Sequence, residues 1–91
     1  MRFAGRTALV TGASRGLGRA IAVAFAAEGA HVFAAYRARE ADAGETLRLV
    51  RAVGSGELLH FDVTKPEEVE AAFAKVHTAR GGLGEIGRAH V

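Results

Sequence analysis

The sequence predicts an α/β fold, specifically the first half of a doubly wound parallel sheet built from consecutive β–α units. Short apolar runs recur along the chain, amphipathic stretches separate them, and a glycine-rich loop joins the first run to the first amphipathic stretch. With 91 residues, the chain has room for one small unit of this kind. We therefore expect three strands that alternate with three helices.

The first β–α unit is predicted between Gly5 and Gly29. Thr7–Thr11 is an apolar run bounded by glycines, which is typical of a strand buried on both faces. After the glycine loop, apolar residues recur at helical spacing, at Leu17, Ala20, Ile21, Ala24 and Phe25. Gly29, directly after Glu28, predicts the end of this helix.

The second unit is predicted from His31 to Gly56. His31–Ala35 is a second apolar run and predicts a buried strand. The polar and apolar residues from Glu40 to Val53 alternate as in an amphipathic helix, whose inward positions include Leu47 and Val50. We expect Gly54-Ser55-Gly56 to end this helix as a turn.

The third unit is predicted to begin with a strand over Leu58–Phe61 that closes at Asp62. Thr64-Lys65-Pro66-Glu67 then fits a capping box, in which the Thr64 hydroxyl and the Glu67 carboxylate each accept a backbone N–H bond. The inward face of the third helix is predicted at Val69, Phe73 and Val76.

Short connections and right-handed crossovers place these strands in parallel, in the spatial order 3-2-1. This is the mononucleotide-binding half of a Rossmann-type, doubly wound sheet. A complete sheet of this type continues with a fourth strand beside the first.

The loop Thr11–Gly18 carries three glycines, each with a physical role. Gly12 allows the chain to turn off the strand, Gly16 lets backbone approach a pyrophosphate, and Gly18 lets the helix pack closely. The following helix N-terminus offers free N–H groups to phosphates. A Walker loop is excluded, because Leu17-Gly18-Arg19 stands where that motif needs Gly-Lys-Ser/Thr. The loop therefore predicts nucleotide binding, the alternative being a purely structural turn.

Composition excludes several classes of function. The chain has no cysteine, so disulfides and thiolate chemistry are excluded, and its four histidines lack ligand-like spacing, so no metal site is predicted. The net charge of +2 comes from charges of both signs that are scattered along the chain, which favours a solvated surface over nucleic-acid binding. With no long apolar run and no signal peptide, the chain is expected to be cytoplasmic, without a membrane partner.

From about Gly5 to Gly84, the sequence resembles the short-chain dehydrogenase/reductase family, especially its branch similar to 3-oxoacyl-[acyl-carrier-protein] reductases. The motif Thr-Gly-x-x-x-Gly-x-Gly at Thr11–Gly18 carries the resemblance. Further matches stand in register, at Glu28-Gly29-Ala30, Tyr36-Arg37, Asp62-Val63 and Glu67-Glu68-Val69. The resemblance implies an oxidoreductase that transfers hydride between NAD(P)(H) and a small carbonyl or alcohol substrate, in a homo-oligomeric parent enzyme.

The residues after the second strand favour NADP(H) over NAD(H). NAD sites place an acidic residue there for the ribose hydroxyls, whereas this chain has Tyr36 and Arg37. A guanidinium can bind a 2′-phosphate through two charge-assisted hydrogen bonds, and Arg15 in the glycine loop could reach the same group. The alternative is that both are solvated loop arginines.

The family counterpart of Asp62 hydrogen-bonds the adenine amino group, and that of Val63 completes the adenine pocket; Asp62 could also cap the third helix. Ser14 is expected to hydrogen-bond either within the loop or to the adenosine ribose. The cofactor-binding residues implied are Gly12, Ser14, Arg15, Gly16, Leu17, Gly18, Tyr36, Arg37, Asp62 and Val63.

No catalytic residue is assigned within these 91 residues. The family uses a serine and a Tyr-x-x-x-Lys pair, but the only tyrosine, Tyr36, is followed by Arg37-Ala38-Arg39-Glu40. We therefore expect the 91-residue chain itself to be inactive. The alternatives are a non-catalytic nucleotide-binding or sensor protein of the same fold, and an interaction module with a vestigial loop.

The segment Glu85–Val91 departs from the family pattern, which calls for a strand ending in Asn-Asn-Ala-Gly. One back-translation of this segment reads as the start of a common sequencing-library adapter followed by a stop codon. We therefore expect residues 1–84 to be the N-terminal half of a dinucleotide-binding domain and 85–91 to be a non-native tail; the alternative is a genuinely short gene.

Overall fold

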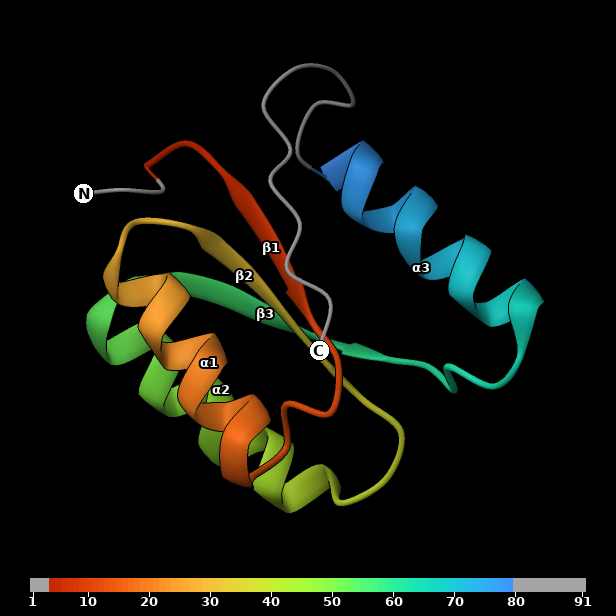
Figure 1. Ribbon diagram of the computed structural model, residues 1–91, viewed down its shortest axis with the longest axis horizontal. Helices are drawn as coiled ribbons and strands as arrows, with labels where there is room; N and C mark the ends of the chain where they lie inside the picture. The colour runs from red at the N-terminus through yellow and green to blue at the C-terminus, as the bar shows by residue number, and fades with distance from the viewer. Residues whose placement is uncertain (1–3, 80–91) are drawn as a thin grey trace.

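The protein, described here by a computed structural model over residues 4–79, folds into a parallel sheet with helices on both faces (Figure 1). Strands and helices alternate along the chain, as β1 (Thr7–Val10), α1 (Gly16–Ala27), β2 (His31–Tyr36), α2 (Glu40–Val53), β3 (Ser55–His60) and α3 (Pro66–Ala79). The strands lie in the order β1-β2-β3, and both pairings are parallel. The predicted sequence of elements and the predicted topology are confirmed.

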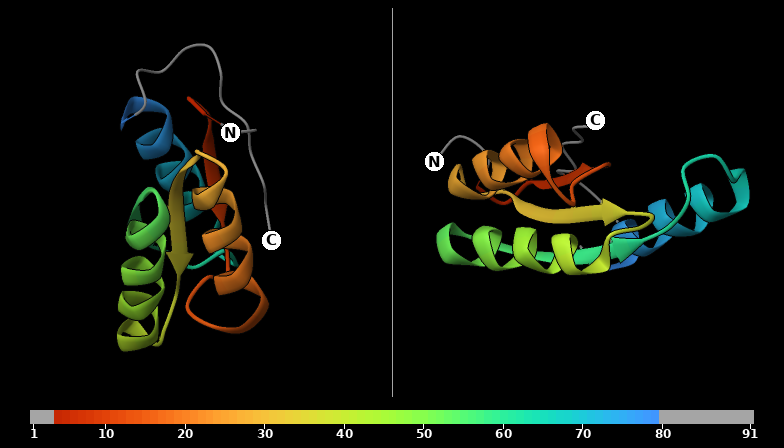
Figure 2. Two further views of the ribbon diagram at one scale, coloured as in Figure 1. Left: turned by 90° about the vertical axis from the view of Figure 1, so that its left-hand side faces the viewer. Right: turned by 90° about the horizontal axis from the view of Figure 1, so that it is seen from below.

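Successive residues of the central strands point to opposite faces of the sheet and build two apolar clusters. Toward α1 and α2, one cluster consists of Ala8, Val10, Ala13, Ala22, Ala26, Ala30, Val32, Ala34 and Val50. Toward α3, the other consists of Leu9, Phe33, Ala35, Leu59, Phe61, Ala72 and Val76. Figure 2 shows the same division, with α1 and α2 side by side on one face of the sheet and α3 on the other.

The buried face of α1 differs from the predicted one. Gly18, Ala22 and Ala26 are buried, whereas the predicted inward residues Leu17, Ala20 and Ala24 are exposed and Ile21 and Phe25 are only partly buried. The helix is apolar almost all round, so periodicity alone left its rotation open. Its rotation follows from Gly18, which must face the Gly12 backbone because there is no room there for a Cβ.

Strand β3 begins earlier than predicted, because Ser55 and Gly56 belong to it and only Gly54 separates it from α2. Gly56 is a site of close packing rather than a turn residue. A Cβ on Gly56 would lie 2.6 Å from the Val32 carbonyl oxygen and 2.7 Å from a Val50 methyl carbon. The glycine therefore lets β3 pack closely against both β2 and α2.

Helix α3 begins at Pro66 without the predicted capping box. The Thr64 hydroxyl donates to Asp62 Oδ1, and it is Glu68 rather than Glu67 whose carboxylate accepts a backbone N–H, that of Asp62. A sequence pattern cannot distinguish these carboxylates, because they are adjacent in the first helical turn. The inward positions Val69, Phe73 and Val76 were predicted correctly.

The remaining differences concern single residues at strand ends. Thr11 lies just beyond β1, Tyr36 extends β2, and Phe61 follows β3, although its N–H still donates to the Tyr36 carbonyl. The predicted domain boundary at residue 84 and the tail 85–91 lie outside the described residues.

Candidate functional site

A cavity of about 540 Å³ opens where the three strands end, at the carboxyl edge of the sheet. Parallel α/β sheets bind their ligands at this edge, because the strand-to-helix loops gather there. The cavity is lined by residues from the ends of all three strands and from α1, namely Thr11, Gly12, Gly18, Ala35, Tyr36, Arg37, Phe61, Asp62, Val63 and Thr64. A small-molecule ligand fits a hollow of this size.

The glycine loop forms one side of this cavity and is tightly constrained. Gly12 has φ of +62°, a conformation that residues with a Cβ rarely adopt. The Ala13 N–H donates to the Ala35 carbonyl over 3.0 Å, which ties the loop to the end of β2. A Cβ on Gly18 would lie 2.0 Å from the Gly12 carbonyl oxygen, so only glycine lets α1 start against the loop. The N-terminus of α1 is thereby held beside the cavity.

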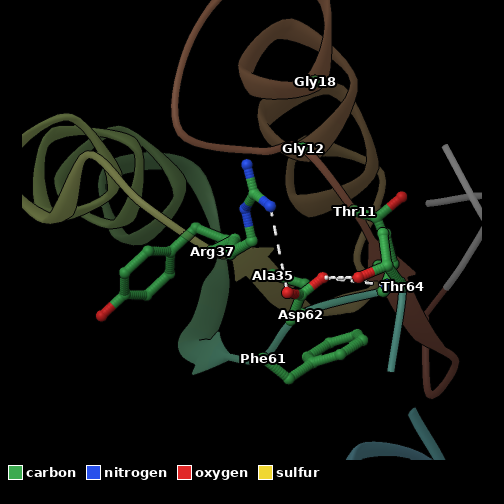
Figure 3. Close-up of a pocket in the computed structure, with 10 residues that line it drawn as sticks. Thr11, Gly12, Gly18, Ala35, Arg37, Phe61, Asp62 and Thr64 are labelled. Atoms are coloured by element: carbon green, nitrogen blue, oxygen red, sulfur yellow. Dashed lines mark hydrogen bonds and ion pairs between the residues drawn. The ribbon is translucent and has the colours of Figure 1, made fainter. Parts of the chain in front are cut away.

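Arg37 and Asp62 both line the cavity, and their charged groups lie next to one another (Figure 3). The Arg37 Nη1 lies 3.9 Å from Asp62 Oδ2, and the Arg37 side chain is 68% exposed. The Asp62 side chain is only 17% exposed, but an ion pair this long with a largely exposed arginine contributes little to stability. The guanidinium is therefore free to leave Asp62 for a stronger anionic partner.

Thr64 holds the Asp62 carboxylate in place. Its N–H and its hydroxyl both donate to Asp62 Oδ1, over 2.9 and 2.7 Å. These bonds, the hydroxyl's first, favour the charged carboxylate and hold the pKa of Asp62 below its ordinary value. Asp62 therefore presents an ionised acceptor to the cavity.

This lowered pKa sets how the contribution of Asp62 to stability varies with pH. A carboxyl whose pKa is lower in the folded state stabilises the protein above its unfolded pKa, and this contribution is lost as pH falls through the folded pKa. We expect the difference in free energy of unfolding between wild type and Asp62→Asn to stay constant from about pH 7 to 5 and to shrink only below about pH 4. Denaturant titrations over this range would check it, and a difference that shrinks between pH 7 and 5 would contradict it.

His60 positions the loop that carries Arg37. Its Nε2 lies 2.8 Å from the Arg37 carbonyl oxygen, so this nitrogen carries the proton and donates. The His60 ring also packs against Tyr36, with ring centroids 5.0 Å apart. Tyr36 and His60 are the last paired residues of β2 and β3, and the bond from His60 to the Arg37 carbonyl holds the chain one residue beyond that pair.

The cavity brings together most, but not all, of the residues predicted from sequence. Gly12, Gly18, Tyr36, Arg37, Asp62 and Val63 line it. The other four predicted residues, which come from the middle of the glycine loop, do not, namely Ser14, Arg15, Gly16 and Leu17. Arg15 is exposed at the start of α1, and Leu17 is 73% exposed.

Sequence reasoning did not single out four lining residues, Thr11, Ala35, Phe61 and Thr64. Three of them could have been predicted, because Thr11, Ala35 and Phe61 lie at the predicted carboxyl ends of the strands, where parallel sheets bind ligands. Thr64 was predicted to cap the third helix instead.

Residues 4–79 contain no group of three or more His, Cys, Asp or Glu side chains that could hold a metal ion. In the same residues, no helix is long and apolar enough to cross a membrane.

Comparison with known proteins identifies the family of the chain. The sequence profile described as short chain dehydrogenase matches residues 6–86. The chain belongs to the short-chain dehydrogenase family. Two curated bacterial members are a 3β-hydroxysteroid dehydrogenase of Eggerthella lenta, 44% identical over 87% of this chain and 31% of its own length, and the 3-oxoacyl-[acyl-carrier-protein] reductase FabG of Escherichia coli, 42% identical over 94% of this chain and 33% of its own.

Solved structures of short-chain dehydrogenases superpose closely on the chain. A Mycobacterium paratuberculosis enzyme bound to NAD is 32% identical, with a TM-score of 0.82 over 94% of this chain and 36% of its own. A metagenomic short-chain oxidoreductase in complex with NADP is 34% identical, with a TM-score of 0.82 over 89% of this chain and 37% of its own. The chain spans about a third of the length of the curated relatives it matches.

Proposed function

We propose that this chain is the part of an NADP(H)-dependent short-chain dehydrogenase that binds the adenosine end of the cofactor. The observation that carries the proposal is the cavity at the carboxyl edge of the sheet, where the glycine loop, Arg37 and the ionised Asp62 meet. Both charges suit one ligand, because a dinucleotide offers an anionic phosphate to Arg37 and an adenine amino group to Asp62.

Each part of the site has a separate task in this proposal. The glycine loop and the N-terminus of α1 present backbone N–H groups to the phosphates. Arg37, whose side chain is largely exposed, binds the 2′-phosphate that distinguishes NADP(H) from NAD(H). Asp62, held by Thr64, accepts a hydrogen bond from the adenine amino group, and Val63 packs beside the ring.

The bound cofactor supplies or accepts hydride, and a small carbonyl or alcohol is the substrate. We place the catalytic serine and the Tyr-x-x-x-Lys pair in a second half of the parent enzyme, which would follow residues 1–84, and we treat 85–91 as a non-native tail. Sequencing the source locus across the codon for Glu85 tests this. A frame that continues into Asn-Asn-Ala-Gly and later Tyr-x-x-x-Lys is expected, and a genomic stop codon after Val91 would contradict it.

Turnover by the full-length gene product tests the enzymatic part of the proposal. We expect carbonyl-dependent oxidation of NADPH, followed at 340 nm (the absorbance of the reduced nicotinamide), in a panel of carbonyl compounds that includes a 3-oxoacyl thioester. The rate should be lower with NADH than with NADPH. Tight NADPH binding without turnover across the panel would favour a nucleotide sensor instead.

A further inference from the structure

The interior side of the glycine loop is held by two side chains that do not line the cavity, Arg19 on α1 and Thr46 on α2. Thr46 is fully buried, and its hydroxyl oxygen lies 2.7 Å from the Ala13 carbonyl oxygen. The Ser14 and Asp42 carbonyls lie farther away, at 3.0 and 3.3 Å. Since the hydroxyl has one proton, it donates to Ala13, and its lone pairs remain free to accept.

Arg19 completes the connection. Its Nε donates to the Thr46 hydroxyl oxygen over 2.9 Å, and its Nη2 lies 2.9 Å from both the Ser14 and the Asp42 carbonyl oxygens. Within residues 4–79 the Arg19 guanidinium forms no ion pair, so its described partners are backbone carbonyls and one hydroxyl. These bonds connect α1, α2 and the glycine loop.

The bonds also determine where the N–H groups of the loop point. In a trans peptide the carbonyl and the following N–H point in opposite directions. Because the Ala13 and Ser14 carbonyls are drawn toward Thr46 and Arg19, the N–H groups of Ser14 and Arg15 point away from them. Among the described residues, neither N–H donates to a backbone carbonyl. The loop thus keeps two donors available and its carbonyl oxygens turned inward, an arrangement suited to an anion.

We propose that Arg19 and Thr46 form a clamp that holds the glycine loop in its phosphate-binding conformation before the cofactor arrives. This role rests on the proposed binding of a nicotinamide dinucleotide. Both are positioning residues, because neither lines the cavity. Without the clamp, the loop would need to be ordered by the cofactor itself, and part of the binding free energy would be spent on that ordering.

The test measures NADPH affinity and thermal stability separately in the full-length protein. Thr46→Val keeps the side-chain volume and removes the hydroxyl, and we expect it to raise the Kd for NADPH about tenfold. Thr46→Ser keeps the hydroxyl and should restore affinity to within about twofold of wild type. Arg19→Lys keeps the charge but loses the forked geometry, and it should also weaken binding, which provides a second variant if Thr46→Val does not fold.

Val50→Ala is the matched control, because Val50 is equally buried on the same helix, but its apolar side chain forms no hydrogen bond to the glycine loop. It should lower the Tm through a cavity while leaving the Kd unchanged. Hydrogen exchange gives the second readout: Thr46→Val should speed exchange of the Ala13 amide, whose N–H donates to the Ala35 carbonyl, and Val50→Ala should not.

The outcomes separate the clamp from the function on which it rests. If wild-type protein binds NADPH and both Thr46→Val and Arg19→Lys bind it equally well, the clamp is wrong and the proposed function stands. If wild-type protein binds neither NADPH nor NADH, the proposed function fails and the clamp with it.

Discussion

Gly18→Ala is expected to weaken dinucleotide binding strongly, lowering the affinity for NADPH by about 100-fold, since overpacking costs up to about 3 kcal/mol. The added Cβ would lie 2.0 Å from the Gly12 carbonyl oxygen and 2.7 Å from its carbon, and both are backbone atoms. No rotamer change can relieve this contact, so α1 must move away from the loop. That movement withdraws the N-terminus of α1 from the cavity. It also disturbs the packing of Ala22 and Ala26, which are buried on the same helix.

Gly44→Ala is the matched control for this experiment. Gly44 lies within α2, where an added Cβ would meet nothing within 4 Å. Alanine in a helix interior should therefore stabilise the protein by about 0.5–1 kcal/mol and leave affinity unchanged. Titration of NADPH into both variants, together with their thermal unfolding, measures the contrast. A Gly18→Ala protein with wild-type affinity would show that the close approach of α1 to the loop is not needed.

Arg37→Asp is expected to have the second-largest effect, a fall of about 100-fold in the ratio of NADPH affinity to NADH affinity. A carboxylate at this position would repel a 2′-phosphate and could accept hydrogen bonds from the ribose hydroxyls of NADH. The fold should survive, because the ion pair with Asp62 is long and the Arg37 side chain is largely exposed. Titrating each cofactor into wild type and variant gives the ratio directly.

Arg48→Asp controls for the change in net charge. Arg48 is exposed on α2, pairs with Glu45 and does not line the cavity. Its substitution should leave the cofactor preference unchanged. If Arg37→Asp keeps the NADPH preference of wild type, Arg37 is a solvated loop arginine and the assignment to NADP(H) fails.

Much of the fold could be predicted because the residues that end each strand and helix can be recognised locally in the sequence. The glycine loop, Gly29 and Gly54 separate apolar runs from amphipathic stretches, and α2 has the predicted bounds, Glu40–Val53. The short connections then left one reasonable topology, which the structure has. The strand ends located the cavity, since parallel strands bring their carboxyl ends to one edge.

What the sequence could not predict depends on contacts between distant segments. The rotation of α1 depends on Gly18 meeting Gly12, and the role of Gly56 depends on Val32 and Val50. Thr46 looks like an ordinary polar residue of a helix, and only the folded chain brings its hydroxyl to a carbonyl 33 positions earlier. Hydrophobic periodicity carries no information about such polar contacts, because they form only once the helices and loops have packed against one another.

The most direct test of the account is a crystal structure of the full-length protein with NADP⁺ bound. We predict that the 2′-phosphate lies within hydrogen-bond distance of Arg37, the adenine amino group donates to Asp62, and the phosphates lie against the loop Thr11–Gly18. A cofactor bound elsewhere, or bound at this edge with Arg37 still paired to Asp62 and its 2′-phosphate in solvent, would contradict the account.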